Sequence, residues 1–189
     1  MGSMTDVVSL TGRLLVATPA LGDPNFHRAV VLVLDHDGDG SLGVVINRPT
    51  AVGVGEVLPP WEDHTSAPGV VFQGGPVALD SALGLAAVPG GAEPLGWRRV
   101  SGGVGLVDLD VPPEVFIRAV AAIRIFAGYA GWGPGQLETE VAEGAWYVLE
   151  AEPGDAFSDD PAGLWRRVLR RQGGDMALVA TFPDDPSNN

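Results

Sequence analysis

The stretch that most constrains the fold covers residues 128–138 and reads Gly128-Tyr129-Ala130-Gly131-Trp132-Gly133-Pro134-Gly135-Gln136-Leu137-Glu138. Four glycines and a proline stand among two aromatic residues, so this run requires an unusual backbone path. We interpret it as a structural corner between two helices. The alternative is an anion site at the start of the second helix, where backbone N–H groups are free. The spacing matches neither the dinucleotide fingerprint nor a phosphate loop.

The segment before this corner predicts a helix over residues 112–128. Pro112 and Pro113 suit a first helical turn, Glu114 complements the helix dipole, and Gly128 would end the helix. Apolar residues recur at helical spacing between these points. A shorter helix is expected over residues 136–142, where Glu138 would cap the first turn.

Strands are expected mainly in the first half of the chain. The acidic run from Asp35 to Gly40 predicts a turn that closes a β-hairpin between residues 29–34 and 42–47. A helical turn is expected over 54–58 and a last helix over 161–171, whereas 176–182 is ambiguous. Because strands precede helices instead of alternating with them, we predict an α+β fold with a mostly antiparallel sheet. The other expected strands are 12–17, 69–73, 84–88, 97–100, 104–109 and 145–151.

Composition excludes several chemistries. The 189 residues include no cysteine, which rules out disulfides, thiolate catalysis and iron–sulfur clusters. All eleven basic residues are arginine, so a Schiff-base lysine and a Walker lysine are absent. The formal net charge of −13 repels a phosphate backbone and disfavours nucleic acid as a partner.

The length and pattern predict a single domain over residues 4–182. Met1-Gly2-Ser3 resembles an expression scar before Met4, and residues 183–189 are expected to form a flexible tail. No segment approaches the ~20 apolar residues of a membrane helix. We therefore expect a cytoplasmic protein without a membrane partner; the sequence carries no signal for an oligomeric state.

Metal and nucleophile motifs are weak. Asp35, Asp37 and Asp39 imitate the start of an EF-hand loop, but Ile46 stands where that loop needs a bidentate glutamate. We interpret the run as a solvated turn and expect no metal and no cofactor. The three histidines lack metal-binding spacing, and the G-x-S-x-G elbow of hydrolases is absent. A triad assembled in space stays open, so no catalytic residue is assigned.

The remaining candidates are loop and turn residues. Gly74-Gly75-Pro76 forms either a tight turn or a place where a ligand approaches the main chain. Arg28 and Arg48 could hold a carboxylate or a phosphate, and a structural salt bridge from Arg48 to Asp23 or Asp35 is the alternative. Trp132, inside the glycine-rich run, is the tryptophan expected to be exposed. The full set of ligand- or partner-binding candidates is Asp23, Asn25, Arg28, Asn47, Arg48, Gly74, Gly75, Pro76, Tyr129, Trp132 and Gln136.

Taken together, four blocks of sequence resemble the AlgH/YqgE family of small bacterial proteins. They are residues 12–19 with 23–30, residues 43–49, residues 74–77, and residues 128–138 continued through Glu140 to Trp146. The resemblance spans roughly residues 10–172, and its fourth block is the most specific. It implies an α+β structure in which a branched, strongly bent sheet forms a pseudo-barrel with helices packed around it.

The same resemblance implies no established enzymatic activity. Some family members are labelled transcriptional regulators, but this chain has no helix-turn-helix pattern and no basic stripe. It also departs from the family pattern in two places. The arginine, aromatic and histidine expected after Gly74-Gly75-Pro76 are missing, and Gly144-Ala145 replaces the usual asparagine before Trp146.

Three functions compete at this point. The leading hypothesis is a non-catalytic ligand- or protein-binding, regulatory module with a shallow site formed by residues 23–28, 47–49, 74–76 and 129–136. The second is an enzyme acting on a small anionic substrate, with arginine clamps and Asp23 or Glu138 as the acid–base group. The third is a regulator that binds DNA directly, which the net charge opposes.

Overall fold

The structure is a computed structural model, and it describes residues 8–183. The predicted scar and the last six residues of the predicted tail lie outside this range. The strands are β1 (Leu14–Ala17), β2 (Val30–Asp37), β3 (Gly40–Val45), β4 (Pro49–Gly53), β5 (Val70–Gln73), β6 (Val77–Ala87), β7 (Trp97–Ser101), β8 (Val104–Val107), β9 (Ala122–Trp132) and β10 (Trp146–Leu149). The α-helices are α1 (Val54–Val57), α2 (Gln136–Ala142), α3 (Leu164–Gln172) and α4 (Asp175–Val179), and six short 3-10 helices join them.

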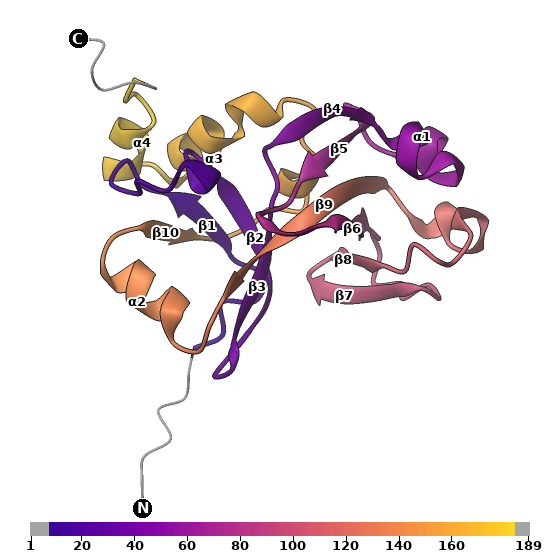
Figure 1. Ribbon diagram of the computed structural model, residues 1–189, viewed down its shortest axis with the longest axis horizontal. Coiled ribbons are helices and arrows are strands. Elements are labelled where there is room, and N and C mark those ends of the chain that lie inside the picture. The colour runs from indigo at the N-terminus through magenta and orange to yellow at the C-terminus, as the bar shows by residue number, and fades with distance from the viewer. Residues whose placement is uncertain (1–7, 184–189) are drawn as a thin grey trace, which may run out of the picture.

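Two sheets share strand β9. One runs in the order β10-β1-β2-β3-β9, and the other places β9 between β6 and β5, with β8, β7 and β4 beyond them. Along one edge of β9, β5 pairs in parallel at Phe126 and Ala127, and β3 then pairs antiparallel from Ala130 to Trp132. Figure 1 shows β9 crossing the middle of the molecule, with the two groups of strands on either side. The fold is therefore α+β, and the two mostly antiparallel sheets join through β9 into one curled and branched assembly.

The expected helix over residues 112–128 is wrong. Two 3-10 turns, Pro113–Val115 and Ile117–Ala119, take its first part, and β9 takes the rest. Residues 123–126 are all buried, because both faces of β9 are covered by other parts of the core. A strand buried on both faces has no polar alternation, so its apolar spacing imitated that of a helix. The glycine-rich run is consequently the end of a strand followed by a turn, and it is not a helix–loop–helix corner.

Glycine is required where β9 passes the segment after β5. A Cβ built on Gly75 would lie 2.2 Å from the carbonyl carbon of Tyr129, and one built on Gly128 would lie 2.6 Å from the carbonyl oxygen of Gly75. Real Cβ atoms do not approach backbone this closely, so the two segments cross in contact only because both positions lack a side chain. The main chain also bonds across this crossing, from the Gly74 nitrogen to the Ala127 oxygen at 2.8 Å.

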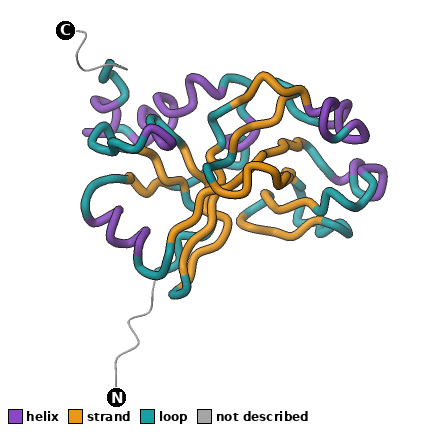
Figure 2. The backbone as a smooth tube through the Cα atoms, viewed as in Figure 1, coloured by secondary structure: helices purple, strands orange, loops and turns teal. Residues whose placement is uncertain are grey.

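Helices α2, α3 and α4 lie beside the first sheet, and α1 lies at the end of β4 (Figures 1 and 2). Helix α3 buries Leu164, Trp165, Val168 and Leu169 against the first sheet, and its polar face is outside. Helix α2 buries Leu137 beside Trp132 and Trp146. Within the described part of the chain, no helix has both the length and the apolar character needed to cross a membrane.

Candidate functional site

The loop between β1 and β2 is fixed by side chains from the following hairpin. Asp23 caps a 3-10 turn at residues 24–26 by accepting a hydrogen bond from the Asn25 nitrogen at 2.9 Å. Asn47 accepts from the Val30 nitrogen at 3.0 Å and donates to the Arg28 carbonyl at 2.9 Å. These contacts account for the predicted turn chemistry of this loop, and they hold the backbone on both sides of Arg28.

Arg48 serves the same loop. Its guanidinium donates to the carbonyl oxygens of His27 at 2.8 Å and Pro24 at 3.5 Å, so the expected salt bridge to Asp23 or Asp35 is replaced by main-chain contacts. Burial lowers the pKa of Arg48, and the nearby Asp23 carboxylate acts in the opposite direction. A guanidinium bonded to two carbonyls in this way positions the loop, and it is not presented to a ligand.

Arg28 is the residue that the loop presents. Its φ of 52° is unusual for a residue with a side chain, and such strained positions cluster at binding and catalytic sites. The guanidinium carbon lies 4.4 Å from the centre of the Trp165 ring, a cation–π contact between the loop and α3. Trp165 is itself fixed, because its indole nitrogen donates to the Ala17 carbonyl at 2.9 Å.

Arg28 and Trp165 line a small pocket of about 90 Å³. The other lining residues come from the β1–β2 loop and from the end of the described chain: Thr18, Pro19, His27, Phe182 and Pro183. Arg28 donates to the Phe182 carbonyl at 2.7 Å. The pocket therefore combines an aromatic wall with a guanidinium that already binds an oxygen atom.

Most of the other candidates are structural. Gly74 and Gly75 are buried at the strand crossing, where no ligand could reach the main chain, whereas Pro76 is exposed. Trp132 is only 6% exposed, which corrects the expectation that it faces solvent. It packs against Phe26 and Trp146, with ring centres 6.4 and 6.1 Å away.

The anion site considered as an alternative at the start of α2 is also occupied from within. Gln136 accepts from the Gly133 nitrogen at 3.0 Å, which takes up one of the N–H groups of that turn. Tyr129 is half-buried and packs against the main core. The glycine-rich run thus builds the turn between β9 and α2, and Glu138 points to another partner instead of capping the helix.

That partner is His36, on the acidic hairpin. Glu138 Oε1 lies 2.8 Å from His36 Nε2, and His36 Nδ1 lies 2.5 Å from Ser41 Oγ. The three side chains have the order of a catalytic triad, but the Nε2–H bond is not directed at the carboxylate and the His36 side chain has no exposed surface. Asp35, Asp37 and Asp39 line a shallow groove together with Ser41. Their negative charges would oppose an oxyanion that developed there. We assign this group to the attachment of α2 to the β2–β3 hairpin.

The acidic residues do not form a metal centre. Among residues 8–183, no group of three or more His, Cys, Asp or Glu side chains is arranged to hold a metal ion. Asp35, Asp37 and Asp39 are exposed, and the predicted hairpin turn lies between β2 and β3.

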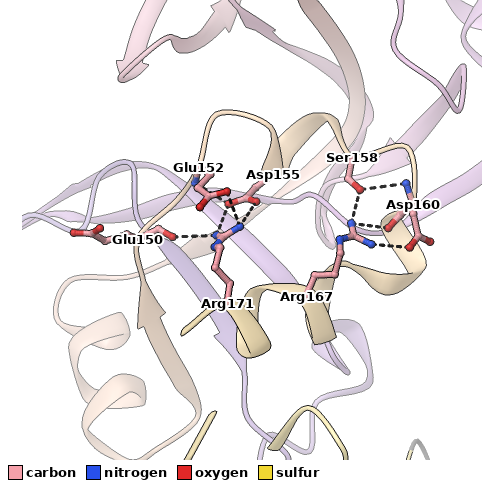
Figure 3. Close-up of polar contacts among 7 residues, drawn as sticks. All are labelled: Glu150, Glu152, Asp155, Ser158, Asp160, Arg167 and Arg171. Atoms are coloured by element: carbon pink, nitrogen blue, oxygen red, sulfur yellow. Dashed lines mark hydrogen bonds and ion pairs between the residues drawn. The ribbon is translucent and has the colours of Figure 1, made fainter. Parts of the chain in front are cut away.

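Helix α3 carries four of the arginines, two of which are paired with carboxylates (Figure 3). Arg171 forms a bidentate pair with Asp155, with both N···O distances 2.9 Å, and Arg167 lies 2.6 Å from Asp160. The Asp155 hydrogen bond raises the pKa of Arg171 despite the desolvation by burial. These contacts fasten the 150–160 loop to α3 and reduce the positive potential that the helix presents.

Sequence reasoning missed Arg124. It is 1% exposed in β9, donates to the carbonyls of Ala67, Ala156 and Ser158, and lies 4.3 Å from the centre of the Phe72 ring. Burial lowers its pKa to about 10, while Asp159 acts in the opposite direction, so it remains charged at neutral pH. An arginine within an apolar run was the available signal, but the helical interpretation of that run concealed it.

The fold and the sequence place the chain in a known class. A family model described as AlgH-like matches residues 14–177, so the chain belongs to the AlgH-like family. A UPF0301 protein from Streptomyces coelicolor is 70% identical over the full length of both chains, and one from Thermobifida fusca is 54% identical over the same coverage.

Solved structures agree with this assignment. The crystal structure of a Corynebacterium diphtheriae protein superposes with a TM-score of 0.88 at 31% identity, over 95% of each chain. The solution structure of AlgH from Pseudomonas aeruginosa gives 0.68 at 28% identity, over 97% of each chain. The resemblance in sequence is therefore confirmed at the level of family and fold.

Proposed function

We propose that this protein is a non-catalytic binding module whose site is the pocket formed by Arg28 and Trp165. The observation that carries the proposal is the strained Arg28, which holds its guanidinium between an aromatic ring and an acceptor oxygen. Asn47 and Arg48 hold the loop in that geometry, because Asn47 donates to the carbonyl of residue 28 and Arg48 donates to the carbonyl of residue 27. A site built in this way selects a ligand with an acceptor oxygen next to an apolar group.

The competing proposal is an enzyme that acts on a small anionic substrate. Such an enzyme needs an acid–base group beside Arg28, within hydrogen-bond reach of the substrate. Asp23 is engaged in capping a turn and Glu138 contacts His36, so neither carboxylate considered for that role supports it. His27 is the titratable neighbour in the pocket, and turnover abolished by His27→Ala would overturn the binding proposal in favour of catalysis.

The indole N–H resonance of Trp165 provides the test. In ¹H–¹⁵N spectra of the full chain, titration with acetate or inorganic phosphate should shift this resonance and the amides of residues 18–28. The resonance is assigned to Trp165 by its disappearance from the spectrum of the Trp165→Phe variant. Arg28→Gly, which suits a positive φ, should abolish the shifts without loss of fold.

The exposed Arg118 supplies the matched control, since Arg118→Ala removes the same charge elsewhere. Shifts that survive in Arg28→Gly, or that disappear equally in Arg118→Ala, would contradict the proposed site. The absence of any response to either anion would do so as well.

A further inference from the structure

The end of the described chain lies on the proposed site. Arg28 donates to the Phe182 carbonyl at 2.7 Å, and Arg166 donates to the carbonyls of Ala180 at 2.6 Å and Phe182 at 3.4 Å. Phe182 and Pro183 also form part of the pocket wall. Two arginines from different elements therefore converge on one short stretch of main chain.

The arginines and the carbonyls that they bind differ in origin. Arg28, Trp165 and Arg166 lie inside the region matched by the family model, which ends at residue 177. Ala180, Phe182 and Pro183 lie beyond it. Residues 181–183 thus lie C-terminal to the matched residues.

Residues 181–183 are exposed and are tied to the end of α4 by main-chain hydrogen bonds from Thr181 to Leu178 and from Phe182 to Val179, whereas Ala180 before them is fully buried. The side chain of Phe182 is 45% exposed, and α4, which precedes it, contributes no fully buried residue. Segments with few buried contacts and solvent-accessible hydrogen bonds open locally without unfolding the rest of the protein. Residues 181–183 can therefore leave the pocket at little cost to the core.

The chemistry of the pocket defines what could replace them. Arginine side chains only donate hydrogen bonds, so they require acceptors such as main-chain carbonyls. A proline after the acceptor residue has no N–H that would need a partner. Pro183 stands in this place after Phe182, whose own N–H is bonded to the Val179 carbonyl at 3.1 Å.

We propose that residues 181–183 are an internal occupant of the position between Arg28 and Arg166, and that the partner is a peptide with an aromatic residue followed by proline. The carbonyl of that aromatic residue takes the place of the Phe182 carbonyl between Arg28 and Arg166. This inference rests on the proposed function, because it assigns a ligand class and a means of regulation to the same site.

Two shortened chains test the inference. One ends at Ala180 and lacks the occupant, and the other ends at Pro183 and retains it. The probe is the capped peptide acetyl-Val-Ala-Thr-Phe-Pro-amide, followed by the Trp165 indole resonance. The chain ending at Ala180 should bind the peptide at least tenfold more tightly than the chain ending at Pro183, which retains the occupant.

Arg28→Gly in the chain ending at Ala180 should abolish binding of the peptide. If that shortened chain does not fold, the full chain with Phe182→Ala and Pro183→Ala replaces it, because it weakens the occupant without shortening the protein. Equal affinities in all chains, or no binding of the peptide to a folded chain without the occupant, would overturn the inference.

The outcomes separate the two proposals. If acetate or phosphate shifts the Trp165 resonance in every chain that keeps Arg28, while removal of the occupant changes nothing, the binding site stands and the internal occupant fails. If neither the anions nor the peptide shift Trp165 in any chain, both fail.

Discussion

The side chains around Arg28 divide into one that faces the pocket and two that set its position. Asn47 and Arg48 were both considered as ligand contacts, yet each uses its polar groups on the loop that carries Arg28. Their residue types could be recognised in the sequence, but their partners could not, because the partners are main-chain atoms about 20 residues away. Asparagine and arginine are as well suited to bonding a protein carbonyl as to bonding a ligand.

We expect Asn47→Ala to lower the free energy of unfolding by about 1–3 kcal/mol, since the part-buried Val30 N–H and Arg28 carbonyl both lose a partner. Asn25→Ala is the control, because Asn25 is exposed and its contact to Asp23 uses the main-chain nitrogen. Urea denaturation of both variants measures the difference. Equal stability in the two would mean that the Asn47 clamp contributes nothing.

At the scale of the elements, β9 shows where sequence reasoning succeeded and where it failed. The hairpin of β2 and β3, the short helix α1 and the helix α2 were all predicted close to their observed bounds. Strand β9 was not, because Ile123, Ile125 and Phe126 are buried together with the residue between them. Local spacing carries the periodicity of one element, whereas the covering of both faces of β9 depends on residues far away in the chain. Leu14, Val30 and Trp165 belong to the core cluster on one side, and Val54 and Trp61 belong to the cluster on the other.

Two glycines in similar backbone conformations separate conformational strain from steric clash. Gly128 has a φ of 74° and no room for a Cβ beside the Gly75 carbonyl, whereas Gly135 has a φ of 71° and open space around it. Gly135→Ala should cost about 1 kcal/mol of stability from backbone strain alone. Gly128→Ala should cost several times as much, by roughly 3 kcal/mol or more, because the strand crossing must also open.

Thermal and urea denaturation of the two variants provides the comparison. A cost at Gly128 no larger than that at Gly135 would show that the crossing can relax, and that glycine there serves only the backbone conformation.

For the molecule as a whole, the charge distribution bears on the label of transcriptional regulator. The net charge is −13, and within residues 8–183 the most arginine-rich helix is α3. Two of its arginines are bound to Asp155 and Asp160, so the helix offers little free positive charge to a phosphate backbone. Binding to nucleic acid gains its affinity from such charges.

We therefore expect no binding to duplex DNA, even at low salt where electrostatic attraction is strongest. Fluorescence anisotropy of a labelled duplex in 20 mM salt measures this. Asp155→Asn with Asp160→Asn is an informative companion variant, because it frees Arg171 and Arg167. A salt-sensitive rise in anisotropy with the unmodified protein would contradict the expectation and restore the DNA-binding hypothesis.

The dual membership of β9 has a consequence for how the protein is made. During synthesis, residues 30–87 leave the ribosome well before residue 132, at roughly 5–20 residues per second. Until then, the edges of β3 and β6 that pair with β9 have no partner. Unpaired strand edges promote association with other chains. The nascent polypeptide therefore spends several seconds with both sheets incomplete. The emergence of β9 from the ribosome then completes both sheets at once.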